Sequence, residues 1–200
     1  MPTPEDPPMP DRPSTPPYQL IDRDVRYQSS FSTVLVDTVQ MPDGSTTTRE
    51  IVDHMPAVGA VPLDADDRVV LLRQYRHSMG RHFLEIPAGK LDVDGEDVAD
   101  AMQRELAEEV ELTAGRMELL LTFTNSAGWT TEQTHVYLAT DLQPAPRPDG
   151  FVLEHEEADM QVLRVPLDEA VAMVHDGRIV DSKTVIGLLA TADRRRREGR

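Results

Sequence analysis

The chain has 200 residues and a formal net charge of −16 at pH 7, and it contains no cysteine. This length suits one domain with a small extension better than two full domains. Because nucleic-acid backbones and anionic membranes repel an acidic chain, we expect neither as a partner. The absence of cysteine excludes disulfides, thiolate catalysis and zinc–thiolate sites.

Residues 1–17 are rich in proline and carry few apolar side chains, so we expect a disordered tail there. No apolar run approaches the about 18 residues of a membrane-spanning helix, and the N-terminus lacks the apolar core of a signal peptide. We therefore expect a cytoplasmic protein.

The residues that follow are rich in Val, Thr and Ile and predict β structure over 18–54. A short strand is expected at 18–27. It precedes a hairpin whose turn is Pro42-Asp43-Gly44, because these residues supply fixed and positive φ angles. Two further strands are expected at 57–63 and 68–76, and the near-continuous apolar run of the second predicts a strand buried on both faces.

After residue 112, apolar and β-branched runs predict strands at 117–125, 134–142 and 160–167. A helix that ends at Gly177 and a closing helix over 182–197 complete the pattern. The last arginines favour the C-terminal end of the closing helix. We expect residues 193–200 to form a basic tail.

Between these strands, the segment from Pro87 to Leu112 places carboxylates where a helix should face the core. At about 100° per residue, Glu105 and Glu109 project about 40° apart and fall within an apolar stripe. That stripe recurs at helical spacing and consists of Val98, Ala101, Met102, Leu106 and Val110.

These two glutamates need a partner, because ionised carboxylates one helical turn apart repel each other and are costly to bury. A divalent cation would neutralise both. Oxygen-only ligands and a third acid at Glu108 favour Mg²⁺, with Mn²⁺ as a substitute. The alternative is a solvated helix face whose acids pair with Arg104.

The same segment resembles the Nudix box, which is a glycine, a glutamate and then the pattern REUxEExGU, where U is aliphatic. The matching residues are Gly89, Glu96, Arg104, Glu105, Leu106, Glu108, Glu109 and Leu112. Two departures stand out. The gap between the glycine and the glutamate is one residue longer than usual. Glu111 replaces the second glycine, which normally ends the helix in a left-handed turn, so a different or mildly strained exit is expected.

The resemblance implies the Nudix fold, an α/β/α sandwich around a mixed sheet, over residues 55–192. It also implies that the N-terminal antiparallel β extension at 18–54 packs across a homodimer. Gln74-Tyr75-Arg76 followed by the residues 85–89 is typical of the ADP-ribose pyrophosphatase branch. The activity implied is the Mg²⁺-dependent hydrolysis of ADP-ribose, a small-molecule nucleoside diphosphate, to AMP and ribose 5-phosphate.

Roles for individual residues follow from the same resemblance. The metal ligands would be Glu105, Glu109, Glu108 and the carbonyl oxygen of Ala88. The general base would be Glu157, with Glu156 as its rival. Substrate contacts would come from Arg49, Glu50, Arg76 and Glu132, and the loop and helix would be braced by Gly89, Glu96 and Arg104.

The loop at 126–133 leaves the substrate open. Ala127 stands where the ADP-ribose branch has a proline, and Trp129 stands where it has another aromatic residue. Trp129 could stack near the nucleotide or serve in a core or interface. A pyrophosphatase for another nucleoside diphosphate sugar or dinucleotide is therefore an alternative. A non-catalytic module that senses ADP-ribose is another.

Overall fold

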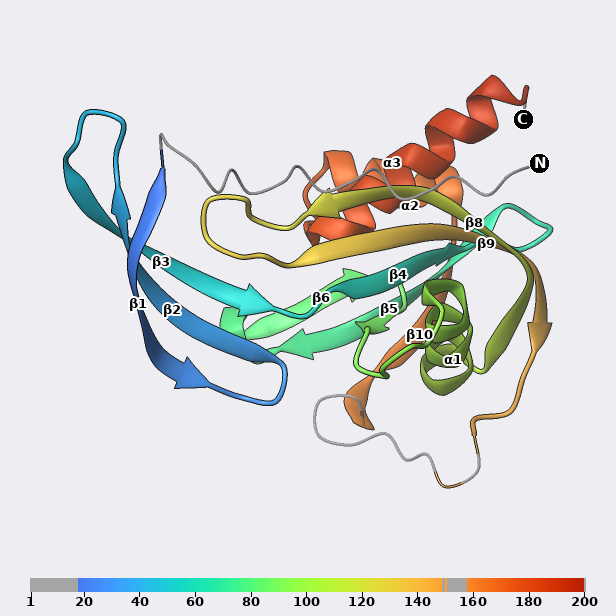
Figure 1. Cartoon of the computed structure of the whole chain (residues 1–200). Coiled ribbons are helices and arrows are strands. Elements are labelled where there is room, and N and C mark those ends of the chain that lie inside the picture. The colour runs from blue at the N-terminus through green and yellow to red at the C-terminus, as the bar shows by residue number, and fades with distance from the viewer. Residues whose placement is uncertain (1–17, 149, 151–157, 200) are drawn as a thin grey trace, which may run out of the picture. The chain divides into compact units, whose positions relative to one another are not determined.

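The computed structural model describes residues 18–148, 150 and 158–199 (Figure 1). The chain divides into two compact units. Of the described residues, 18–54 and 128–131 belong to the first unit, and 55–127 and those from 132 onward belong to the second. In the described part of the chain, no helix is both long enough and apolar enough to cross a membrane.

The first unit is a three-stranded antiparallel sheet, as predicted. Its strands are β1 (Gln19–Gln28), β2 (Ser32–Gln40) and β3 (Thr46–His54), in the order β1-β2-β3. The β2–β3 hairpin turns at Gly44, whose φ of 84° lies in the left-handed region. The predicted strand and hairpin are confirmed.

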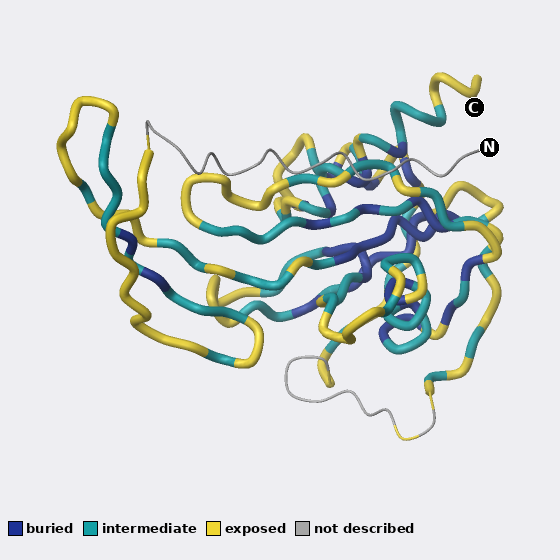
Figure 2. Tube along the Cα trace, in the orientation of Figure 1, coloured by how far each residue is buried: buried dark blue, intermediate teal, exposed yellow. Residues whose placement is uncertain are grey.

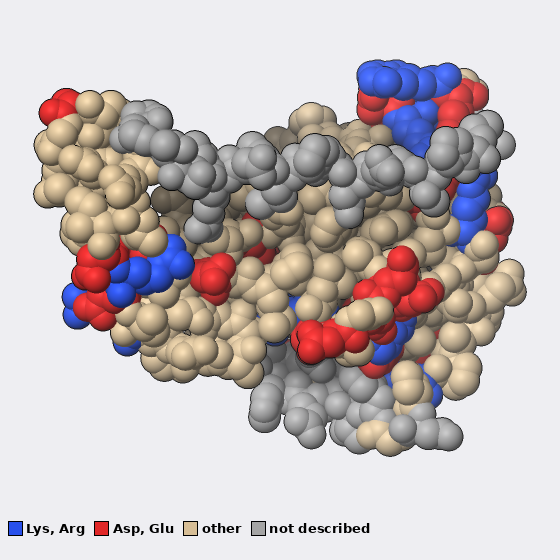
Figure 3. All heavy atoms as spheres, viewed as in Figure 1, with Lys and Arg blue, Asp and Glu red and all other residues tan. Residues whose placement is uncertain are grey.

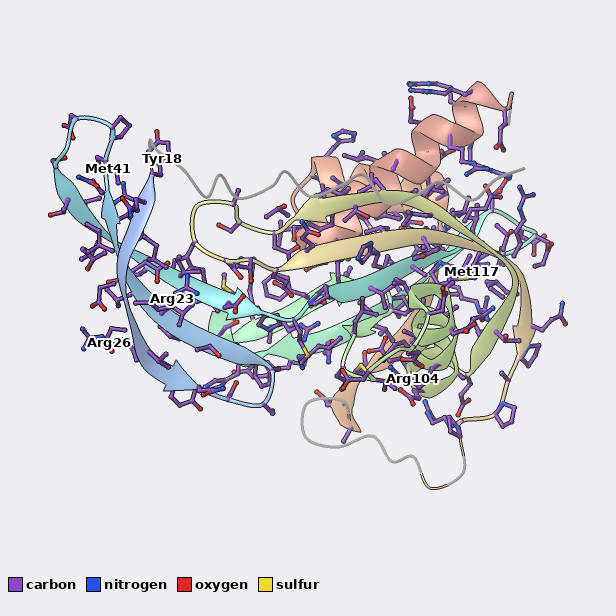
Figure 4. The ribbon with its side chains drawn as sticks, in the orientation of Figure 1. Tyr18, Arg23, Arg26, Met41, Arg104 and Met117 are labelled. Carbon is purple, nitrogen blue, oxygen red and sulfur yellow. The ribbon has the colours of Figure 1, made fainter. Side chains whose placement is uncertain are left out.

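An ion pair joins two strands of this sheet. Arg23 of β1 donates from Nε and Nη2 to the two carboxylate oxygens of Asp37 in β2, at 2.7 Å each (Figure 4). Asp37 is only 5% exposed. Burying this carboxylate is tolerable because a bidentate guanidinium satisfies it.

The second unit contains a mixed four-stranded sheet in the order β7-β4-β9-β8. The strands β4 and β9 are parallel, and the other pairs are antiparallel. These strands are β4 (Ala57–Pro62), β7 (Ala88–Lys90), β8 (Leu112–Thr124) and β9 (Gln133–Pro144).

A second, antiparallel sheet in the order β10-β5-β6 lies in the same unit. Its strands are β5 (Arg68–Arg76), β6 (Arg81–Glu85) and β10 (Gln161–Pro166), and the short 3-10 turn η1 (His77–Met79) joins β5 to β6. The helices of the unit are α1 (Val98–Val110), α2 (Leu167–His175) and α3 (Ser182–Arg197).

The strand β5 is buried on both faces, as predicted, and shows how the layers are built. Val70 and Leu72 belong to the core cluster that contains the apolar stripe of α1. Val69 and Leu71 belong to the cluster that contains apolar side chains of α2 and α3. Because side chains alternate across a strand, α1 covers one face and α2 with α3 the other, which is the expected α/β/α sandwich. Figure 2 shows the buried residues concentrated along these central strands.

The closing helix α3 runs from Ser182 through Arg197, as the sequence predicts, and it includes most of the basic segment 193–200. Long-range ion pairs hold this last part of the helix, because Arg194 pairs with Glu118 and Arg195 pairs with Asp67. Sequence pattern alone does not reveal such partners.

Candidate active site

The glutamate helix α1 begins where the side chain of Asp97 accepts a hydrogen bond from the main-chain N–H of Ala99 at 2.8 Å. Its stripe residues Ala101, Met102, Leu106 and Val110 are buried. Glu109 is 8% exposed, and the side chain of Glu105 is 13% exposed. Both glutamates therefore face the body of the second unit, as their helical spacing predicts.

The carboxylate of Glu105 lies directly against the main chain of Gly89. A Cβ atom added at Gly89 would stand 2.1 Å from both Cδ and Oε1 of Glu105. Only glycine allows so close an approach. The first glycine of the box therefore makes room for a carboxylate.

Glu109 reaches the same loop one residue earlier. Its Oε2 accepts a hydrogen bond of 2.9 Å from the main-chain N–H of Ala88. The structure thus brings Glu105 and Glu109 close to the main chain of Ala88 and Gly89. In the sequence, the glutamates are separated from these two residues by a loop and by the first part of α1.

Arg104 binds several carboxylates around this point (Figure 4). It donates to Glu96 from Nε and Nη2, both at 3.2 Å, and from Nη1 to Glu105 at 2.8 Å and Glu108 at 3.2 Å. These hydrogen bonds join the loop before α1 to the helix. On the face shown in Figure 3, acidic side chains gather in the region of α1.

The electrostatics of Glu105 reflect its burial. Desolvation raises the pKa of Glu105 to about 7, the charge of Arg104 opposes the shift, and the charge of Glu108 adds to it. A cation close to this carboxylate would favour its ionised form.

These residues fit a hard divalent cation, because Glu105 and Glu109 supply oxygen donors beside a main-chain turn. Within the described ranges, no three His, Cys, Asp or Glu side chains converge as a metal-binding group by themselves. Glu108 instead has its carboxylate bound to Arg104. A complete protein ligand set would thus need a main-chain oxygen such as that of Ala88, with water.

The helix leaves this site through Glu111, which has a φ of 56° and a ψ of 41°. As expected, the residue that ends the helix is strained. Glu111 adopts the left-handed conformation that a glycine would adopt here, although it carries a side chain. Arg147 holds this turn from the loop after β9. Its Nε donates to the carbonyl oxygen of Glu108 at 2.7 Å, and its Nη1 binds the Glu111 carboxylate.

Arg76 ends β5, and its guanidinium binds Glu85 through two hydrogen bonds. The hydrogen bond to Glu85 is the largest cause that raises the pKa of Arg76, burial opposes it, and the charges of Glu85, Asp181 and Glu109 raise it further. The negative charge of Glu109 therefore acts on Arg76.

Glu132 follows the loop at 126–131 and is oriented by Asn125, which sequence reasoning missed. Asn125 donates from Nδ2 to Glu132 Oε2 at 2.7 Å and accepts from the hydroxyl of the buried Thr134 at 2.8 Å. The sequence gives no signal for Asn125, because its amide acquires a role only when β8 and β9 pair.

Of the other predicted residues, two lie in the first unit and two lie outside the described residues. Arg49 and Glu50 lie in β3 of the first unit, where Arg49 donates to the carbonyl oxygen of Thr48 at 2.8 Å. Glu156 and Glu157 lie outside the described residues.

A family model described as the NUDIX domain matches residues 53–185. An ADP-ribose pyrophosphatase of Mycobacterium tuberculosis is 38% identical over 173 residues, which cover 86% of this chain and 82% of that protein. A methanol dehydrogenase activator of Bacillus methanolicus is 37% identical over 153 residues, which cover 76% of this chain and 80% of the relative.

The crystal structure of an ADP compounds hydrolase superposes with a TM-score of 0.79 at 23% identity, and the match covers 92% of this chain and 96% of that one. At this identity the likeness concerns the fold. Together with the family match and the relatives, it leads to one conclusion: the chain belongs to the Nudix hydrolase family.

Proposed function

We propose that this protein hydrolyses the diphosphate bond of ADP-ribose to AMP and ribose 5-phosphate. The observation that carries the proposal is the packing of the Glu105 carboxylate against Gly89 while Glu109 binds the Ala88 N–H. Two carboxylates therefore lie close to the same main-chain segment, at Ala88 and Gly89. The activity named for the Mycobacterium tuberculosis relative supports ADP-ribose as the substrate.

Mg²⁺ is the proposed cofactor, and Mn²⁺ would substitute for it. Glu105, Glu109 and the carbonyl oxygen of Ala88 would hold it, with Glu108 near by. When bound, such a cation neutralises the diphosphate and polarises water. Gly89 keeps the space for Glu105, and Arg104 holds the helix and the loop in register.

Glu157 is the proposed general base, and Glu156 is the rival. The base accepts a proton as a water oxygen forms a bond to one phosphorus atom, while the bond from that phosphorus to the bridging oxygen breaks. The bridging oxygen leaves with the other phosphate. The carboxylate used as the base should contribute a factor of about 10² to 10⁴ in rate.

Substrate contacts are proposed for Arg76 and Glu132 in the second unit and for Arg49 and Glu50 in the first. Arg76 offers a guanidinium that suits phosphate oxygens. Glu132 offers a carboxylate already oriented by Asn125 and suited to accept a sugar or base N–H or O–H group.

We also propose that the protein is a homodimer that uses residues 18–54. Five large apolar side chains of this region are between 48% and 63% exposed: Tyr18, Leu20, Ile21, Val25 and Tyr27. Exposed apolar side chains gathered along one strand are costly in water and suit burial against a second copy. The proposed domains are a 1–17 tail, this 18–54 extension, a hydrolase domain at 55–192 and a basic tail at 193–200, in a cytoplasmic protein.

Another nucleoside diphosphate sugar or a dinucleotide is the second candidate substrate, because Ala127 and Trp129 depart from the ADP-ribose pattern. Trp129 is 57% exposed, so its indole is accessible to a ligand. A non-catalytic sensor of ADP-ribose is the third possibility, and it is disfavoured because both glutamates of α1 are present and face inward.

The test is hydrolysis of a substrate panel with Mg²⁺ by the unmodified protein and by Glu109→Gln. The panel contains ADP-ribose, ADP-glucose, GDP-mannose, NADH and diadenosine polyphosphates. AMP released from ADP-ribose, and lost in the variant, is the expected result. Preferred cleavage of another compound would replace the substrate, and binding of ADP-ribose without turnover of any compound would support a sensor.

The base is tested separately with Glu157→Gln and Glu156→Gln at saturating Mg²⁺. We expect the first variant to lower kcat at least about 100-fold and the second to lower it much less. The reverse order would make Glu156 the base.

A further inference from the structure

The guanidinium of Arg76 is fixed on one edge only. Nε donates to Glu85 Oε1 at 2.8 Å and Nη2 donates to Glu85 Oε2 at 2.6 Å. In the described parts of the chain, Nη1 finds no acceptor, and the side chain is 43% exposed. A planar guanidinium held in this way keeps a second, unused edge in a fixed direction.

Glu85 is itself held from the opposite side. It is 2% exposed, and its Oε2 also accepts from Nζ of Lys183 at 2.5 Å. Lys183 is one of only two lysines in the sequence, and its side chain is 14% exposed. A carboxylate this deeply buried requires partners for both oxygens. Arg76 and Lys183 together supply them.

The lysine is anchored by the first turn of α3. Lys183 also binds Asp181, at 3.1 Å, and Asp181 accepts from the N–H of Thr184 at 3.1 Å and from its hydroxyl at 2.6 Å. The Thr184 hydroxyl oxygen then accepts from the main-chain N–H of Ile86 at 2.9 Å. The beginning of α3 thus holds both the side chain of Glu85 and the main chain next to it.

Charge in this network is balanced. Two carboxylates, Glu85 and Asp181, face two cations, Arg76 and Lys183. If Lys183 were absent, Arg76 alone would have to neutralise Glu85, with Asp181 close to it. The free edge of Arg76 would then attract an anion less strongly and would be less well fixed.

We propose that Lys183 and Glu85 are positioning residues that orient the free edge of Arg76 toward the diphosphate of the substrate. Neither residue touches the substrate; both act through Arg76. This inference rests on the proposed function, because it needs Arg76 to bind phosphate oxygens. It assigns a role in recognition to α3, far in sequence from the glutamate helix.

The test is a double-mutant cycle with Lys183→Met and Arg76→Ala. The probe is α,β-methylene-ADP-ribose, which resists hydrolysis, and its affinity is measured calorimetrically in the presence of Mg²⁺. We expect Lys183→Met to weaken binding about tenfold when Arg76 is present and less than about twofold when it is replaced. For ADP-ribose itself, KM should rise with a smaller change in kcat.

Two variants serve as controls. Lys183→Arg keeps the charge and should retain most of the affinity. Arg178→Met removes an exposed cation that pairs with Asp176 and should leave both affinity and KM unchanged. An equal loss from Lys183→Met in both Arg76 backgrounds, or no loss in either, would overturn the proposal.

A measurement on the unmodified protein covers the case in which Lys183→Met does not fold. Nitrogen-15 NMR of the arginine side chains should show slow rotation of the Arg76 guanidinium about the Nε–Cζ bond, and fast rotation would overturn the proposal. If the unmodified protein neither binds the analogue nor cleaves ADP-ribose, the proposed function fails. The NMR result then still decides whether Arg76 is fixed.

Discussion

Replacing Gly89 by alanine is a direct test of the proposed metal site. The new Cβ would stand 2.1 Å from Cδ and Oε1 of Glu105 and 2.6 Å from Oε2, whereas ordinary contacts begin at 3.4 Å. The carboxylate must therefore move by about 1.3 Å. Because it is the end of a flexible side chain, the fold should survive, and we expect stability to change by no more than about 1 kcal/mol.

The effect on activity should be much larger. A misplacement of about 1 Å in a reacting constellation can lower the rate by about 10²-fold. We therefore expect kcat/KM of Gly89→Ala for ADP-ribose to fall by about 100-fold. The apparent affinity for Mg²⁺ should fall as well, because Glu105 would no longer meet Glu109 at the same point.

The assay combines steady-state kinetics over a range of Mg²⁺ concentrations with direct binding of Mn²⁺ followed by electron paramagnetic resonance. The matched control is Glu105→Ala, which removes the group with which the new methyl collides. Adding Gly89→Ala to Glu105→Ala should cost little further activity. Full activity and normal Mn²⁺ affinity in Gly89→Ala alone would refute the placement of Glu105 in the site.

Three further predictions concern stability, each measured by urea unfolding. Because Glu111 occupies the left-handed region, Glu111→Gly should be more stable than Glu111→Ala by about 1 kcal/mol; equal stabilities would contradict that backbone conformation. Asp97→Ala should cost about 1 kcal/mol, since the N-terminal cap of α1 is lost, and no change would argue against the cap. Burial alone would raise the pKa of Glu85, but Arg76 and Lys183 lower it to about 2 from an ordinary value of 4.5. Ionised Glu85 therefore stabilises the fold fully above pH 4.5, by roughly 3 kcal/mol, and this contribution is lost as the pH falls toward 2. The stability difference between the unmodified protein and Glu85→Gln should shrink over that range, and a constant difference would contradict the pairing.

The sequence by itself determined the elements that depend on neighbours along the chain. Helical spacing placed Glu105 and Glu109 on the inward face of α1, because residues one turn apart share a face whatever surrounds the helix. The hairpin at Gly44 and the doubly buried strand β5 likewise follow from local turn chemistry and an apolar run.

The C-terminal end of α1 shows what a local sequence pattern cannot predict. The sequence indicated strain at Glu111, and the backbone there is left-handed. It did not indicate Arg147, which holds that turn from the far end of β9. It indicated the closing helix through Arg197 but not the partners of Arg194 and Arg195, because those partners lie in other strands and turns.

The tertiary structure alone decided which charges are buried together. Glu85 ends β6 and is almost fully buried, but its partner Lys183 lies 98 residues away in the sequence. Asn125 meets Glu132 only across paired strands. A buried carboxylate is stable only where cations or N–H donors reach it. Periodicity describes one element at a time, so it cannot supply those partners; the packing of α3 against the end of β6 does.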